Sequence, residues 1–256
     1  MLYICNMDLV IIGSGNVAYH LTKAFKENNI LVKQVYGRNE AELQKISNET
    51  GFNYSTAQLE SADLYLISVS DNAVHDVSKI ITNPNVLVAH TSGSLPKEIL
   101  AGNYRKASFY PLQTFSKNKK LQYSEIPFFV EAENNEDEEL LLNLARKVSD
   151  KVMLSTYDKR KYIHLTAVFA CNFVNHLFAR AKEISDSQEI PFSYFLPLID
   201  ETTEKIHHLE PLNAQTGPAV RNDKRILEMH EELLSGEHLE IYKVLNESIK
   251  KMYNLE

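Results

Sequence analysis

The fold of this chain is decided by the stretch Asp8-Leu9-Val10-Ile11-Ile12-Gly13-Ser14-Gly15-Asn16-Val17-Ala18. An apolar run predicts a buried strand, Gly13 permits a tight turn after it, and Gly15 lets backbone approach a pyrophosphate because it has no Cβ. Ala18 lets the next helix, expected over 16–27, pack closely on the strand. The free N–H groups and positive dipole end of that helix would then point at phosphates. The motif alone is weak, but the strand and helix beside it favour a dinucleotide site.

The composition excludes several classes of protein. The chain has 256 residues, of which 44% are hydrophobic and 24% charged, and its net charge is -7. This composition is typical of a globular protein, and the absence of a dense Lys/Arg block makes nucleic acid an unexpected partner. No apolar run is long enough to span a membrane and no secretory signal is evident, so we expect a cytoplasmic protein. Two cysteines, Cys5 and Cys171, cannot form a disulfide framework, and Cys171 is expected to be a small core residue.

Alternating strands and helices fill the first part of the chain. Strands are expected at 30–36, 52–54, 63–69, 85–89, 105–109, 127–131 and 151–154, with helices between them. From Asp158, which is expected to cap a helix over 159–187, only helical periodicity follows, with further helices over 191–208, 223–235 and 238–253. We therefore predict an α/β protein: a doubly wound Rossmann domain at residues 1–155 and an all-α domain at residues 156–256.

The tip of the second strand carries Gly37-Arg38-Asn39. NAD-selective sites usually place an acidic residue here for the ribose 2′-hydroxyl, whereas a cation suits a 2′-phosphate. Arg38 and Asn39 therefore predict NADP as the cofactor. Alternatively, Arg38 is an ordinary surface arginine before the next helix.

Polar residues also follow the later strands, where a doubly wound sheet binds its ligands. Ser70, Asp71 and Asn72 could contact the cofactor, although Asp71 could equally cap a helix. His90-Thr91-Ser92-Gly93-Ser94 would lie near the nicotinamide, or form a simple turn and helix cap. The full set of predicted cofactor contacts is Gly13, Ser14, Gly15, Asn16, Val17, Arg38, Asn39, Val69, Ser70, Asp71 and Thr91.

Two further segments could hold a substrate. Lys161, His164, Asn172 and Asn175 fall within one arc of the long, mostly apolar helix, although buried polar residues often only hydrogen-bond their neighbours. In the irregular segment 215–223, Arg221 could bind a carboxylate or could pair with a nearby acid. The histidines lack suitable acidic or thiol partners, so we expect no metal site.

Motifs along most of the chain resemble a Rossmann-like family of NADP-dependent oxidoreductases whose C-terminal half is an all-helical domain of unknown function. The resemblance is carried by Gly13-Ser14-Gly15-Asn16-Val17-Ala18, Gly37-Arg38-Asn39, His90-Thr91-Ser92-Gly93-Ser94, Phe109-Tyr110-Pro111-Leu112-Gln113-Thr114-Phe115, Phe169-Ala170-Cys171-Asn172 and Thr216-Gly217-Pro218-Ala219-Val220-Arg221-Asn222-Asp223. The chain is also distantly similar to pyrroline-5-carboxylate reductases, deazaflavin-linked NADP reductases and the 6-phosphogluconate dehydrogenase superfamily, including the C-terminal domain of the last.

Two departures limit what the resemblance implies. Hydroxyacid dehydrogenases of the superfamily carry Lys-x-x-x-Asn on their long helix, but here Leu165 follows Lys161 at that spacing. Oxidation of a β-hydroxyacid by the usual route is therefore not expected. Tyr110 stands where histidine is common in the family, and it places a phenol there instead.

We therefore predict an NADP-dependent oxidoreductase that transfers a hydride to or from a small, anionic carbonyl or imine compound. The proposed catalytic residues are His164 as proton donor or orienter, Asn172 as a positioning amide, Arg221 as anion anchor and Ser92 as a polar contact. The apolar helix favours a homodimer built through the C-terminal domain. The alternatives are a non-catalytic NADP sensor or scaffold that dimerises through its helical domain, and a vestigial turn that binds nothing.

Overall fold

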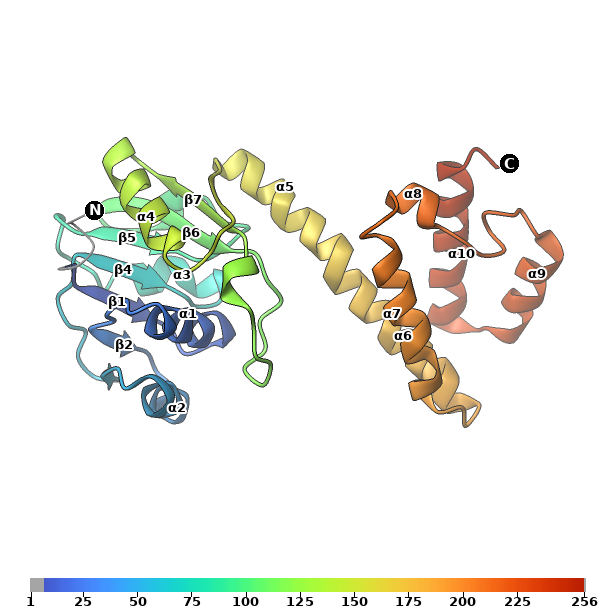
Figure 1. The fold of residues 1–256 in the computed structure, drawn as a ribbon, viewed down its shortest axis with the longest axis horizontal. Coiled ribbons are helices and arrows are strands. Elements are labelled where there is room, and N and C mark those ends of the chain that lie inside the picture. The colour runs from blue at the N-terminus through green and yellow to red at the C-terminus, as the bar shows by residue number, and fades with distance from the viewer. Residues whose placement is uncertain (1–6, 256) are drawn as a thin grey trace. The chain divides into compact units, whose positions relative to one another are not determined.

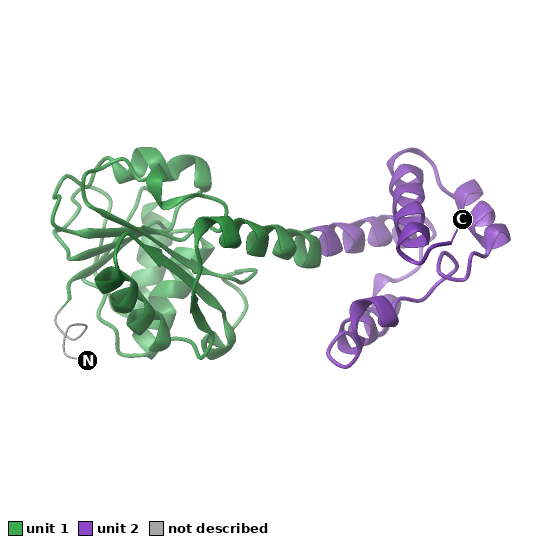
Figure 2. Ribbon diagram, turned by 90° about the horizontal axis from the view of Figure 1, so that it is seen from above, with its two compact units in different colours: residues 1–172 green, residues 173–256 purple. Residues whose placement is uncertain are grey.

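In the computed structural model, which describes residues 7–255, the chain divides between Asn172 and Phe173 into two compact units (Figure 2). The first unit holds the sheet and the second is helical. Cys5 lies outside the described residues. Within those residues, no helix is both long and apolar enough to cross a bilayer.

The strands of the first unit form one mixed sheet (Figure 1). They are β1 (Leu9–Ile12), β2 (Gln34–Tyr36), β3 (Tyr54–Ser55), β4 (Leu64–Ile67), β5 (Leu87–His90), β6 (Arg105–Pro111), β7 (Phe128–Ala132) and β8 (Val152–Leu154). Their order is β3-β2-β1-β4-β5-β6-β7-β8, and all neighbours are parallel except β6 and β7. The order reverses direction beside β1, which is the switch point where doubly wound sheets bind ligands. This arrangement confirms the predicted fold class.

Every residue of the central strands is buried, because helices cover both faces of the sheet. Leu9 and Ile11 of β1 face α1 (Asn16–Glu27), α2 (Glu40–Thr50) and α4 (Asn135–Arg146) in one apolar cluster. Val10 and Ile12 belong to the opposite cluster, which includes Val74 of α3 (Asp71–Ser78). Continuous apolar strands of this kind are typical of a parallel sheet that is covered on both sides.

The long helix begins with α5 (Tyr157–Ala167), passes through a π-helical segment, η4 (Val168–Phe173), and continues as α6 (Val174–Ser187). The side chain of Thr156, and not the predicted Asp158, caps α5 by accepting a hydrogen bond from the N–H of Lys159. The π segment widens the turn, so a wheel drawn with α-helical periodicity does not hold across it. The predicted shared arc of His164 and Asn172 was based on that wheel and stays a prediction.

Two local predictions are also corrected. Cys171 is exposed in the π segment and is not a core residue. Tyr110 and Pro111, which were predicted in a loop, are the last residues of β6, because this strand continues along β7 as an antiparallel pair.

The second unit consists of helices with few buried residues. After α6 come η5 (Phe192–Phe195), α7 (Leu196–Lys205), α8 (Pro211–Ala214), α9 (Lys224–Leu233) and α10 (Gly236–Met252). Among its described residues, 173–255, only Ser185, Ala219 and Leu227 are buried. Large apolar side chains are instead exposed on every helix longer than one turn.

Candidate functional site

The turn between β1 and α1 requires glycine at one position and leaves open space at the other. Gly13 has φ +139°, and a Cβ there would lie 2.1 Å from the carbonyl oxygen of Ser68. Only glycine therefore fits where β1 and β4 come together. Gly15 is the N-cap of α1, has no side-chain cap, and a Cβ on it would meet no atom within 4 Å. The N–H groups of the first turn of α1 are thus accessible to an anion.

A pocket of about 840 Å³ opens at this turn. Its volume is in the usual range for a small-molecule or cofactor site. Nine of the predicted cofactor contacts line it: Gly13, Ser14, Gly15, Asn16, Val17, Arg38, Asn39, Val69 and Ser70. The wall also contains Asn72 and Val77 of α3, and Ile80 just after this helix. The pocket therefore combines a helix N-terminus with an apolar surface on which a planar base could lie.

The tip of β2 gives this pocket a cationic end. Arg38 lines the pocket, and Asn39 caps α2 by accepting a hydrogen bond from the N–H of Glu42. Because Arg38 and Asn39 both line the pocket, the positive end of the α2 dipole lies at the same edge of the pocket as Arg38. These two features together suit a dianionic phosphate.

Two predicted contacts lie outside the lining of the pocket. Asp71 accepts a hydrogen bond from the hydroxyl of Ser94 at 2.9 Å, while Ser70 and not Asp71 is the N-cap of α3. The Thr91 hydroxyl is buried and donates toward the carbonyl of Ile67 at 3.4 Å. Asp71 thereby connects α3 to the loop after β5.

A phenol and an imidazole on neighbouring elements form a polar pair in the same unit. The hydroxyl of Tyr110, at the end of β6, lies 3.1 Å from Nδ1 of His164 on α5. Burial, with a smaller effect of the Asp71 carboxylate, raises the pKa of Tyr110 to about 12. A Cβ on Gly93 would lie 2.6 Å from the Tyr110 ring and 2.9 Å from Nδ1 of His164, so the backbone of the loop after β5 packs directly on the pair.

Ser92 belongs to the same loop but its hydroxyl is used inside it. Its Oγ accepts a hydrogen bond from the N–H of Ser94, and its own N–H donates to Nδ1 of His90. Burial, and then the charge of Arg160, lowers the pKa of His90 to about 4, so this ring is neutral at physiological pH. Internal hydrogen bonds therefore hold the loop, and Ser92 makes one of them with His90 and one with Ser94.

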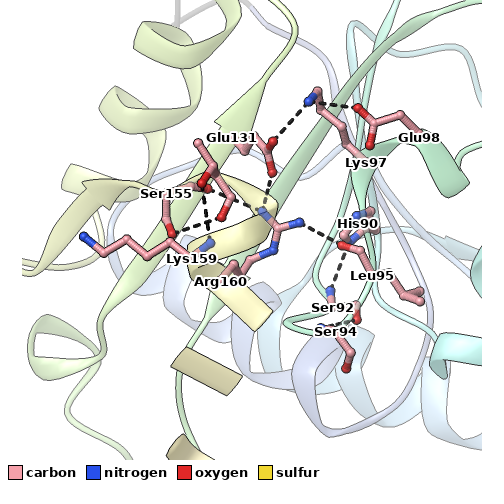
Figure 3. A network of polar contacts seen from close by, with 11 residues as sticks. His90, Ser92, Ser94, Leu95, Lys97, Glu98, Glu131, Ser155, Lys159 and Arg160 are labelled. Carbon is pink, nitrogen blue, oxygen red and sulfur yellow. Dashed lines mark hydrogen bonds and ion pairs between the residues drawn. The ribbon is translucent and has the colours of Figure 1, made fainter. Parts of the chain in front are cut away.

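A buried arginine connects the loop after β5 to α5 (Figure 3). Arg160 has no exposed surface, and it donates to the carboxylate of Glu131 at 2.6 Å and to the carbonyl of Leu95 at 2.7 Å. Lys97 also pairs with Glu131, at 3.0 Å. Arg160 is one turn before His164 on α5, so the same contacts locate the helix that carries the imidazole.

The remaining predicted residues are not brought into this group. Asn172 is exposed in the π segment. Lys161 pairs at 2.7 Å with Asp158, one turn earlier on the exposed side of α5. Arg221 is exposed in the helical unit. The roles assigned to Asn172 and Arg221 stay predictions.

Sequence reasoning missed three residues of this region: Tyr110 as the partner of His164, Arg160 and Glu131. Tyr110 was noticed only as a departure from a family pattern. No local signal marks Arg160, because its partners are 29 and 65 residues away.

The comparisons with known proteins agree with this geometry. Residues 126–249 match a family described as a domain of unknown function, DUF2520. This match begins near β7 and so includes the last strands as well as the helical unit. No curated protein matches the chain in sequence.

Solved structures provide the clearest relationships. A reductive aminase from Aspergillus terreus, in complex with NADPH and ethyl-5-oxohexanoate, is 15% identical with a TM-score of 0.69, covering 96% of this chain and 94% of that one. A 1-pyrroline-5-carboxylate reductase from Streptococcus pyogenes is 11% identical with a TM-score of 0.65, covering 97% and 99%. At these identities the likeness concerns the fold.

A nearer relative has been solved from Bacteroides fragilis, the putative NADP oxidoreductase BF3122. It is 37% identical to this chain with a TM-score of 0.91, and the match covers 97% of this chain and 99% of that one. The identity over nearly full length exceeds what a shared fold alone requires. This chain therefore belongs to the same family of NADP oxidoreductases as the Bacteroides fragilis protein.

Proposed function

We propose that this protein is an NADPH-dependent reductase of small carbonyl or imine compounds. One observation carries the proposal: the same unit contains both a dinucleotide-sized pocket lined by Arg38 and a part-buried Tyr110–His164 pair. The nicotinamide half of a dinucleotide in a doubly wound sheet extends past the switch point toward the later strands. Tyr110, at the end of β6, is on that side. The relatives that act with NADP support the same choice of cofactor.

The polar pair favours reduction over oxidation. NADPH, when bound, supplies the hydride that reaches the carbon of the C=O or C=N bond. Tyr110, whose pKa is raised to about 12, carries its proton at neutral pH and can donate it to the oxygen or nitrogen as that atom gains negative charge. Nδ1 of His164 is then close enough to return a proton to the phenolate. In this proposal Ser92 holds the loop beside the pair, and Asn172 and Arg221 keep the roles predicted for them from the sequence.

The cofactor choice gives a direct test. We expect Arg38→Ala to weaken NADPH binding at least tenfold and NADH binding less than twofold, because only NADPH has the 2′-phosphate that the guanidinium would bind. Titration of nicotinamide fluorescence measures both affinities. Equal losses for the two cofactors would remove the 2′-phosphate assignment. NADPH oxidation with a panel of small ketones, 2-oxo acids and cyclic imines then separates a reductase from a non-catalytic NADP sensor.

We also propose that the protein is a homodimer formed through its helical unit. Large apolar side chains on several helices of this unit are exposed, among them Tyr194 (74%), Leu198 (64%), Leu233 (76%) and Val244 (68%). Exposed apolar area on this scale normally marks an interface. A second copy of the chain is the partner that is always present, and closed two-fold dimers are the commonest assembly.

A double substitution tests the dimer. Leu198→Lys with Val244→Lys should convert a species of twice the chain mass of 29.3 kDa into monomer, because two charges would be buried in the interface. Sedimentation velocity measures the mass. Leu31→Lys is a matched control, since Leu31 is 70% exposed in the other unit. A wild-type monomer, or a dimer that survives the double substitution, would contradict the proposal.

A further inference from the structure

A lysine outside the predicted cofactor contacts reaches the glycine turn from the loop between β6 and β7. Lys117 Nζ donates to the carbonyl of Ser14 at 2.8 Å and pairs with the carboxylate of Glu42. Its side chain is only 15% exposed, which is low for a lysine. The ammonium thus bridges the turn at the start of α1 and the first turn of α2.

The chain just before Lys117 is fixed to α1. The side-chain amide of Asn16 donates to the carbonyl of Phe115 at 2.9 Å, and Nε2 of His20 lies 2.9 Å from the carbonyl of Ser116. The rings of His20 and Phe115 are also in contact, with centroids 5.3 Å apart. Since Asn16 itself lines the pocket, this part of the loop is anchored at the pocket's edge.

The charges around Lys117 explain why a cation is needed there. Glu42 is in the first turn of α2, three residues after the cap Asn39 and near the pocket residue Arg38. The hydrogen bond from Lys117 lowers the pKa of Glu42, so this carboxylate stays ionised. An ionised carboxylate would repel a phosphate bound at Arg38 and the start of α2. Lys117 neutralises that carboxylate, and its ammonium lies against Ser14, which lines the pocket.

We propose that Lys117 is a second cation for the 2′-phosphate of the cofactor and, with Arg38, sets the preference for NADP over NAD. This inference rests on the proposed function, because it assumes that the pocket holds NADP. The ammonium contacts Ser14 and Glu42, and Ser14 and Arg38 both line the pocket. When the phosphate is present, the ammonium is shared between it and Glu42. The preference for phosphate is thus set by two segments that are about 80 residues apart in the chain.

The test compares two nucleotides that differ only in the 2′-phosphate, 2′,5′-ADP and 5′-AMP, by isothermal titration calorimetry. Lys117→Met should weaken 2′,5′-ADP at least tenfold and 5′-AMP less than threefold. Lys117→Arg should keep most of the preference, because the charge is retained. Lys119→Met is the matched control, since Lys119 is an exposed lysine of the same loop, and it should change neither affinity more than twofold.

Glu42→Gln separates direct binding from mere neutralisation of the carboxylate. If Lys117 contacts the phosphate, the double variant Lys117→Met with Glu42→Gln binds 2′,5′-ADP more weakly than Glu42→Gln alone. Equal affinities would overturn the direct contact.

The two proposals fail in different ways. A wild-type protein that binds 2′,5′-ADP and 5′-AMP equally would overturn NADP as the cofactor. A wild type that prefers 2′,5′-ADP and loses this preference in Arg38→Ala, but not in Lys117→Met, would overturn only the role of Lys117.

Discussion

Gly93→Ala is expected to lower the rate of NADPH-dependent reduction about 100-fold while the affinity for NADPH changes less than twofold. The added Cβ would lie 2.6 Å from the Tyr110 ring and 2.9 Å from Nδ1 of His164, so the two side chains must move apart. A displacement of about 1 Å at reacting groups can cost on the order of 100-fold in rate. Single-turnover oxidation of NADPH, with the panel compound that the wild type reduces best, measures the change.

Gly15→Ala is the matched control and should show the opposite pattern. A Cβ on Gly15 meets no protein atom within 4 Å, so the fold should keep its stability. The methyl group would occupy the space where a pyrophosphate approaches the backbone, and NADPH affinity should fall. If Gly93→Ala retained full turnover, the Tyr110–His164 pair would not be the proton donor. If Gly15→Ala bound NADPH normally, the pyrophosphate would not approach this turn.

Arg160→Met should lower the free energy of unfolding by about 3 kcal/mol, which is the low end of the cost of breaking a buried ion pair. The substitution leaves Glu131 with Lys97 as its remaining ion-pair partner, and it removes the donor to the carbonyl of Leu95. The Arg160 side chain has no exposed surface and that of Glu131 is only 11% exposed, so water replaces the lost hydrogen bonds poorly. Urea denaturation followed by circular dichroism gives the difference.

A neighbouring lysine supplies the control for Arg160→Met. Lys161→Met removes an exposed pair with Asp158 on the same helix and should cost less than about 0.5 kcal/mol. Adding Glu131→Leu to Arg160→Met should recover part of the loss, because it removes the carboxylate that was left behind. A cost below about 1 kcal/mol for Arg160→Met would mean that this network does not stabilise the loop and α5.

The fold was predictable from sequence because each step of it has a local cause. The apolar run 9–12 has to be buried on both faces, and glycine follows it where a Cβ would collide with the backbone of Ser68, just after β4. The predicted helix over 16–27 agrees with α1 to the residue. The π segment 168–173 was not predictable, because hydrophobic periodicity cannot register a single widened turn.

The site was predictable only where its residues are near the glycine turn or at strand ends. Arg38 and Asn39 follow β2 directly, so their place in the pocket follows from topology. Lys117 and Arg160 act through partners that folding brings from distant parts of the chain. A sequence pattern gives the periodicity of an element, but the pairing of two charges depends on the register of several elements at once.

The two glycines of the turn predict how relatives of this protein would diverge. Gly13 is required by the approach of two strands whether or not a nucleotide is bound, whereas Gly15 is required only by a ligand. A relative that no longer binds the nucleotide could replace Gly15 but would still need Gly13. Loss of the second glycine with survival of the first would therefore be the mark of a descendant that kept the architecture and gave up the chemistry.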